Sequence, residues 1–168
     1  PTVIVPNDIQ VEASSIDANI VEFGSAEASD LVEISSITND APEVFPLGET
    51  IVTWTATDIS GNSSFISQTV SIIDTTFPVI EISDYEFEAN ISNGSNSSLS
   101  LPLISDIQDV TITNDAPEVF PLGETIVTWT ATDTSGNSAS ATQIISVIDT
   151  TSPVIEISKS LSFEAINQ

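Results

Sequence analysis

A run of 22 residues, ITNDAPEVFPLGETIVTWTATD, occurs twice without a change, at residues 37–58 and 112–133. The similarity continues past the run through SGNS and DTT-x-PVIEIS, and it reaches backwards, where DIQVEA matches DYEFEA and SLSFEA. A period of about 75 residues indicates a tandem array of small folding units. We expect a first repeat at 1–76, a second at 77–151, and at 152–168 the first strand of a third repeat or an assembly strand.

Within a repeat, apolar and polar residues alternate, which is the pattern of a half-buried β-strand. Val52, Trp54 and Ala56 fall on one face and threonines on the other. The alternating run that follows DISGN predicts the second strand of a hairpin, and TVIV, IQVEA, NIVEF and LVEISSI supply earlier strands. No segment has a helical period. About seven short strands per repeat predict an all-β fold of tandem immunoglobulin-like sandwiches, arranged end to end, with Trp54 and Trp129 in the cores.

The charge balance excludes several classes of function. The 168 residues include one Lys or Arg, 25 Asp or Glu, no His and no Cys, for a net charge of −24 at pH 7. Nucleic acids and anionic membrane surfaces are bound by basic residues, so neither is an expected partner. No apolar stretch approaches the roughly 18 residues of a membrane span. Without His or Cys the chain offers no ordinary zinc site and no base to activate a serine, so we expect no enzyme. Because it starts at Pro1 rather than Met, we expect a processed chain.

The spacing of these motifs resembles one known family. A Pro-x-Ile opening, a VEA or FEA strand, FPLGETIVTWTATDxSGNS and a closing DTT-x-P are similar to the HYR (hyalin repeat) family. The closing half carries most of the resemblance, since residues 14–34 and 90–109 differ between the two copies. The resemblance implies an immunoglobulin-like module in tandem on extracellular and microbial surface proteins. Family members often have Cys or Tyr where Trp54 and Trp129 stand, so no core disulfide carries over.

The repeated acids predict a calcium site between repeats. In such a sandwich the first and last strands run in the same direction, so the chain enters at one pole and leaves at the other. Stacking two repeats then brings together Glu12, Asp74, Asp133 and Asn137, an all-oxygen set that suits Ca²⁺. Cadherin-like arrays have a similar arrangement of acids at the junctions between their modules. The matching positions are Asp58, Asn62, Glu88 and Asp149, and two acids in the TNDAP loops, Asp40 and Asp115, are secondary candidates.

Each of these motifs also has a purely structural interpretation. DISGN is a good hairpin turn, in which Asp58 and Asn62 cap their own backbone and Gly61 supplies a positive φ. DTT is a plausible turn capped by Asp74. The calcium prediction therefore depends on whether the acids of adjoining repeats meet.

Four Asn-x-Ser sequons predict surface N-glycosylation, although a chain rich in Ser and Asn produces such sequons by chance as well. They lie at Asn62, Asn90, Asn93 and Asn96.

Three functions remain open at this stage. The first is a non-catalytic structural module of an extracellular fibre, adhesin or surface layer, assembled with further repeats or copies of itself and stiffened by Ca²⁺. The second is an adhesion module that binds surface glycans or a protein through its variable loops. The third is a spacer in a larger secreted enzyme. All three place the chain outside the cell or on its surface, and the resemblance suggests a microbial source.

Overall fold

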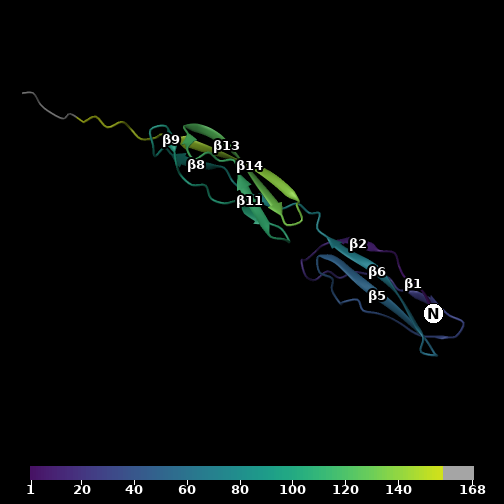
Figure 1. The fold of residues 1–168 in the computed structure, drawn as a ribbon. Helices are drawn as coiled ribbons and strands as arrows, with labels where there is room; N and C mark the ends of the chain where they lie inside the picture. Colours follow the sequence, from purple (N-terminus) through teal and green to yellow (C-terminus); the bar gives the residue numbers. More distant parts are fainter. Residues whose placement is uncertain (157–168) are drawn as a thin grey trace, which may run out of the picture.

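A computed structural model describes residues 1–156 of the chain. The described residues form fourteen β-strands and no helix, which confirms the all-β prediction. Accordingly, no helix in this part of the chain is long and apolar enough to cross a membrane. Figure 1 shows the strands gathered in two groups, β1 to β6 in one part of the molecule and β8 to β14 in another. The segment 152–168, expected to be the first strand of a third repeat or an assembly strand, lies mostly outside the described residues.

The first group is built around a hairpin of two long strands. β5 and β6 pair antiparallel over ten residue pairs, and β4 and β2 extend the sheet to the order β2-β6-β5-β4. β2 runs parallel to β6, while β1 pairs antiparallel with β3. The strands are β1 (Thr2–Ile4), β2 (Ile9–Glu12), β3 (Glu27–Ser29), β4 (Ile34–Asn39), β5 (Gly48–Asp58) and β6 (Ser63–Ile73).

The second group repeats this plan. A four-stranded sheet has the order β11-β13-β14-β8, again with its first strand, β8, parallel to its last, β14. β7 pairs with β10 and β9 with β12. The strands are β7 (Val79–Glu81), β8 (Tyr85–Glu88), β9 (Gly94–Ser95), β10 (Leu103–Ser105), β11 (Val110–Asn114), β12 (Phe120–Pro121), β13 (Gly123–Asp133) and β14 (Ser138–Ile148).

The pairing pattern identifies the fold class. In both groups the leading segment contributes one short strand to each layer, and the second of these runs parallel to the final strand. The remaining sheet partners are antiparallel and include the closing hairpin, as in immunoglobulin-like sandwiches. The fold class is therefore immunoglobulin-like, and the repeat boundaries at 76 and 151 stay predictions.

Each group has its own core on the inward face of the long hairpin. In the first group Phe45, Val52, Trp54, Val70 and Ile72 are buried together. The second core is built from Phe120, Val127, Trp129, Ile145 and Val147. Both tryptophans are buried as predicted, and each donates its indole N–H to a buried glutamine at 3.1 Å: Trp54 to Gln68 and Trp129 to Gln143.

One predicted strand is absent from its place. The segment NIVEF forms only an isolated bridge, between Asn19 and Phe45. The Asn19 side chain accepts hydrogen bonds from the backbone N–H of Ser14 and of Ser15, which folds this segment locally and competes with a ladder. Phe23 nevertheless reaches the core, where its ring centroid lies 5.8 Å from that of Trp54.

Candidate metal centre

The loop that closes each long hairpin is organised by one aspartate. Asp133, at the end of β13, accepts hydrogen bonds from the backbone N–H of Asn137 at 2.8 Å and from the Asn137 side-chain amide at 2.8 Å. Asp58 holds Asn62 in the same way, at 2.9 Å for both contacts. These hydrogen bonds hold the pKa of Asp58 below its usual value, the largest contribution coming from the Asn62 side chain. The capping role expected of a turn aspartate is therefore present in both loops.

The segment after β6 carries the second part of the centre. Thr75 donates its backbone N–H and its hydroxyl to the two carboxylate oxygens of Glu12, each at 2.8 Å. The Thr76 hydroxyl lies 2.5 Å from Asp74 Oδ1 and 3.4 Å from Glu12 Oε1, so it stands between the two acids. These contacts lower the pKa of Glu12, chiefly through the backbone N–H of Thr75. The hydrogen bonds favour the ionised form of Glu12 and hold the two acids beside each other.

Three aspartates from different parts of the chain converge here. Asp74 follows β6, Asp106 follows β10 and Asp133 ends β13, yet one carboxylate oxygen from each lies within 4.8 Å of the other two. Asp74 and Asp133 are buried, and Asp106 is half-buried. Burial raises the pKa of Asp74, but hydrogen bonds from Thr76 and Gln108 outweigh it, so the pKa lies below its usual value. Among the described residues this is the only group of three such acids.

Two amide side chains surround this cluster. Gln108 donates its amide N–H to Asp74 Oδ2 at 2.5 Å and also to the Ser135 hydroxyl. Asn137 donates to Asp133 and to the backbone carbonyl of Asp74, at 3.1 Å. The hydrogen bond from Asn137 joins the hairpin loop of the second group directly to the segment that leaves the first.

The structure brings some predicted site residues together and leaves others apart. Asp74, Asp133 and Asn137 meet, while Glu12 stands beside them, close enough for the charge of Asp74 to raise its pKa slightly against the lowering hydrogen bonds. Asp106 joins the cluster without having been predicted. The other predicted ligands, Asp58, Asn62, Glu88, Asp149, Asp40 and Asp115, lie outside the cluster of three.

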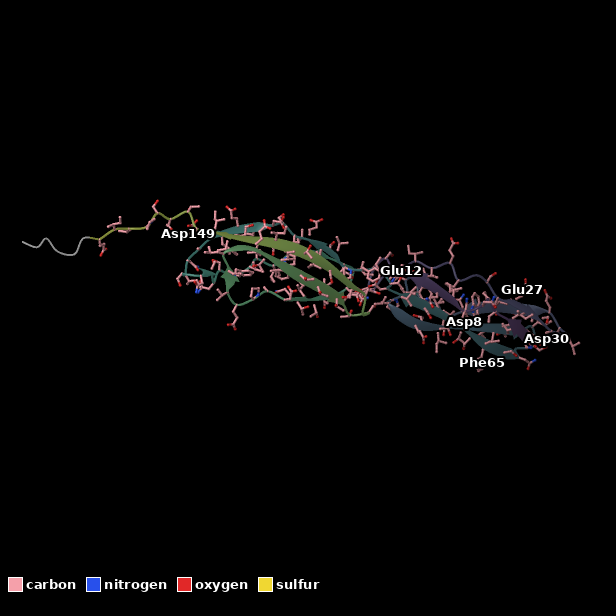
Figure 2. All side chains as sticks on the ribbon, turned by 90° about the horizontal axis from the view of Figure 1, so that it is seen from above. Asp8, Glu12, Glu27, Asp30, Phe65 and Asp149 are labelled. Atoms are coloured by element: carbon pink, nitrogen blue, oxygen red, sulfur yellow. The ribbon has the colours of Figure 1, made fainter. Side chains whose placement is uncertain are left out.

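Those outlying residues have defined partners of their own. Glu88 accepts hydrogen bonds from Thr150 at 2.8 and 2.9 Å, so it repeats the arrangement of Glu12 and Thr75. Asp149 accepts from Thr151, whose side chain lowers the pKa of that acid. Asp40 and Asp115 each accept a backbone N–H of the neighbouring long strand, at 2.6 Å. Figure 2 shows Glu12 in the middle of the molecule and Asp149 near one end.

The sequons differ in how free their side chains are. The amide nitrogen of Asn62 is bound to Asp58, whereas Asn93 is exposed at a turn before β9. Asn90 accepts the backbone N–H of Asn96 at 3.1 Å, and both are at least partly exposed. Glycosylation at these positions stays a prediction.

The residues present fit a hard divalent cation. Ca²⁺ takes about 6–8 oxygen ligands, and three carboxylates supply up to six oxygens. Gln108 and Asn137 turn their amide N–H groups toward the acids, so their side-chain oxygens are not part of this set. No cationic side chain neutralises these acids among residues 1–156, since the chain has one Lys or Arg and it is Lys159. The donor set and the unbalanced charge both suit a hard divalent cation.

Comparison with known proteins tests the family assignment. Residues 73–147 match the family model of the HYR domain. This stretch belongs to the HYR domain family. Over 174 residues the chain is 36% identical to hyalin of Lytechinus variegatus, with 94% of this chain and 33% of that protein covered. It is 34% identical over 169 residues to hyalin of Strongylocentrotus purpuratus, with 94% of this chain and 14% of that protein covered.

A further relative is the Rattus norvegicus protein called Sushi, von Willebrand factor type A, EGF and pentraxin domain-containing protein 1. The two sequences are 32% identical, and the match covers 82% of this chain and 4% of that protein. The chain therefore spans a third or less of these relatives. All of them are animal proteins, which gives the expected microbial source no support.

Among solved structures, Drosophila N-cadherin EC1-4 matches at 14% identity and a TM-score of 0.39, covering 86% of this chain and 48% of that one. So low a TM-score implies nothing about the site.

Proposed function

We propose that this chain is a non-catalytic structural and adhesion module that acts outside the cell, and that Ca²⁺ stiffens the junction between its two strand groups. The family of residues 73–147 supports a tandem module, because the hyalins named above match along 94% of the chain. The excess of acid, with 25 Asp or Glu against one Lys or Arg, supports a cation as partner. Further repeats or copies of the same protein are its natural neighbours in an array.

One observation carries the calcium proposal. The three clustered aspartates come from both sides of the connection: Asp74 follows the last strand of the first group, while Asp106 follows β10 and Asp133 ends β13 in the second. The cluster therefore exists only while the two groups hold one particular orientation. Anything that stabilises the cluster also stabilises that orientation.

Electrostatics gives the direction of the effect. Two unit charges 4.8 Å apart repel by about 3 kcal/mol at an effective dielectric constant of 20, and by about 1 kcal/mol in water. Bound Ca²⁺ supplies positive charge that turns this repulsion into attraction. Asp74, Asp106 and Asp133 hold the ion, and Thr75 and Thr76 keep Glu12 in place beside them. Extracellular modules bind calcium at about 10⁻⁴–10⁻³ M, so millimolar calcium suffices.

Calorimetry and small-angle scattering together test this function. We expect calorimetry to detect calcium binding at millimolar concentration, and the maximum dimension in scattering to shorten in EDTA. Asp74→Ala should reproduce the EDTA result in the presence of calcium. The control is Asp109→Ala, which removes one exposed acid beyond the cluster and should change neither measurement. Thr75→Ala is not neutral, because Thr75 binds Glu12. Absence of calcium binding together with unchanged scattering would leave the loops as turns only.

The adhesion alternative has one observation in its favour. A groove of about 640 Å³ in the second group is lined by Tyr85, Leu101 and Leu103, among others, and part of it comes from the variable segment 90–109. Tyr85 packs on Phe87 at a centroid distance of 4.8 Å, and it is exposed, so its ring is accessible to a sugar. Glycan-array binding that disappears in Tyr85→Ala supports this function, and an array without any binding removes it.

A further inference from the structure

The outward face of each long hairpin is a regular array of hydroxyl groups. In the second group one rung across β11, β13 and β14 consists of Thr113, Thr130 and Ser140, and the next consists of Thr111, Thr132 and Ser138. Hydroxyls are hydrogen-bonded along both rungs, at 3.2 Å between Thr130 and Ser140 and at 2.9 Å between Thr132 and Ser138. We call the outward residues of β11, β13 and β14, and their equivalents on β4, β5 and β6, the hydroxyl face.

The hydroxyl face carries no charge at its centre. From the Ile126–Ile144 rung to the Thr132–Ser138 rung, every outward residue is Thr, Ser or Ile. Acids surround this centre: Glu124 begins β13, and Asp115 caps the backbone of Thr128. On the β8 side Asp84 accepts the backbone N–H of Ile144, and Glu86 lies opposite Ser146. In a chain with a net charge of −24, this is a surface on which a second acidic molecule meets no carboxylate.

Large apolar side chains stand on this face. In the first group Phe65 lies opposite Thr55 and is 76% exposed, and Ile51 is 66% exposed. Ile126, which occupies the place of Ile51 in the second group, is exposed to the same extent. Figure 2 shows Phe65 at the outer surface of the first group. An uncharged centre with exposed apolar residues and an acidic rim shares the depletion of charge that marks the core of a protein interface.

We propose that the hydroxyl face binds a second copy of this chain, face to face. Two copies repel each other strongly, and like charges brought together across an interface cost several kcal/mol. A contact between two hydroxyl faces keeps the carboxylates at the rim, in water. Hydroxyls both donate and accept hydrogen bonds, so an array of them complements itself, as a two-fold symmetric interface requires.

The size of the face sets the strength of this contact. In the second group two strands of eleven residues, about 36 Å long, and one of five residues, about 17 Å long, lie about 4.8 Å apart and present roughly 430 Å² per copy. A pair of such faces buries roughly 900 Å² in total, which is below the roughly 1,000 Å² expected of a specific interface. The contact of one strand group is therefore weak, and both groups of a chain have to engage for it to persist. This proposal depends on the proposed function in one respect: both need copies of the chain to lie side by side.

Sedimentation equilibrium of the whole chain in EDTA tests the proposal without involving calcium. Because salt screens repulsion between the copies, we expect dimers at submillimolar protein in about 0.5 M NaCl and fewer dimers at low salt. Thr130→Asp and Thr130→Lys should both weaken the dimer at least tenfold, since each places a charge at the centre of the buried face. Phe65→Ser, which gives the first group the residue found at Ser140, should weaken it less.

The two charge variants distinguish a buried face from a net-charge effect. If net charge alone controlled association, the lysine variant would strengthen it, and that result would overturn the proposal. Ser100→Asp, at an exposed position outside the hydroxyl face, is the matched control and should leave the dimer unchanged. Circular dichroism checks that each variant is folded. A chain that stays monomeric at about 1 mM in high salt also refutes the proposal, whether or not the chain binds calcium.

Discussion

Asp106→Asn isolates the repulsion among the three clustered aspartates. Asp106 accepts the backbone N–H of Gln108 through Oδ1 at 2.8 Å, and asparagine keeps that acceptor while removing the charge. The substitution eliminates two of the three carboxylate pairs in the cluster, each worth at least about 1 kcal/mol at the water limit. In EDTA the variant should therefore unfold with a free energy about 2 kcal/mol higher. For a chain of this size that corresponds to a rise in Tm of about 4–8 °C.

Calcium should narrow this difference in stability. With calcium at ten times its Kd, binding stabilises the native protein by about 1.4 kcal/mol, and a variant that has lost a ligand gains less. We expect the calcium affinity of Asp106→Asn to fall at least tenfold. Differential scanning calorimetry with EDTA and with 10 mM calcium measures both effects, and Asp109→Asn is the control. If Asp106→Asn lowers Tm in EDTA, or Asp109→Asn raises it equally, the three carboxylates do not repel one another as argued.

Three further predictions concern the fold. Trp54→Phe leaves the buried oxygen of Gln68 without its donor and should lower the free energy of unfolding by about 1–3 kcal/mol in urea titrations. The pKa of Glu12 is lowered in the folded state, so its contribution to stability is complete above its unfolded pKa, near 4.3, and is lost as pH falls through the folded pKa. Glu12→Gln should accordingly flatten the acid limb of a Tm-against-pH profile. Gly94→Ala places a Cβ against the backbone carbonyl of Phe120 and should melt the second group.

Each of these predictions has a control at a matching position. Trp129→Phe should show the same loss as Trp54→Phe, and unequal losses would mean that the indole hydrogen bond is not the cause. Glu33→Gln, at an exposed acid, should leave the acid limb unchanged. Gly123→Ala also has a positive φ but meets open space, so it should cost only about 1–2 kcal/mol. Equal effects of the two glycine substitutions would contradict the steric argument.

The sequence predicts most of the fold because its strongest signals are local. The alternation through TWTATD determines which side of β5 is buried, and the parity of Trp54 and Trp129 follows from it. The prediction of a strand at NIVEF was wrong because the Asn19 side chain binds the backbone just before it. A side-chain hydrogen bond of this kind cannot be recognised from hydrophobic periodicity.

The candidate site is only partly predictable, for a related reason. Asp74, Asp133 and Asn137 belong to the motifs that repeat, so strand direction alone brings them to one pole. Asp106 lies in the variable segment, and its place depends on how the loop after β10 turns. One signal was available. The dipeptide Ser-Asp occurs at Asp30 and again at Asp106, in a region where the two repeats otherwise share little.

The parallel pairing of β2 and β8 with the last strand of their groups has a mechanical consequence. Because β2 runs parallel to β6, and β8 to β14, the chain enters each four-pair ladder at one end and leaves it at the other. A force that pulls on the two ends of a strand group therefore acts along these strands and loads the ladder in shear. The hydrogen bonds of such a ladder have to rupture together, whereas an antiparallel hairpin pulled from its open end unzips one bond at a time. Each strand group is thus built to resist stretching along the axis that joins its two ends.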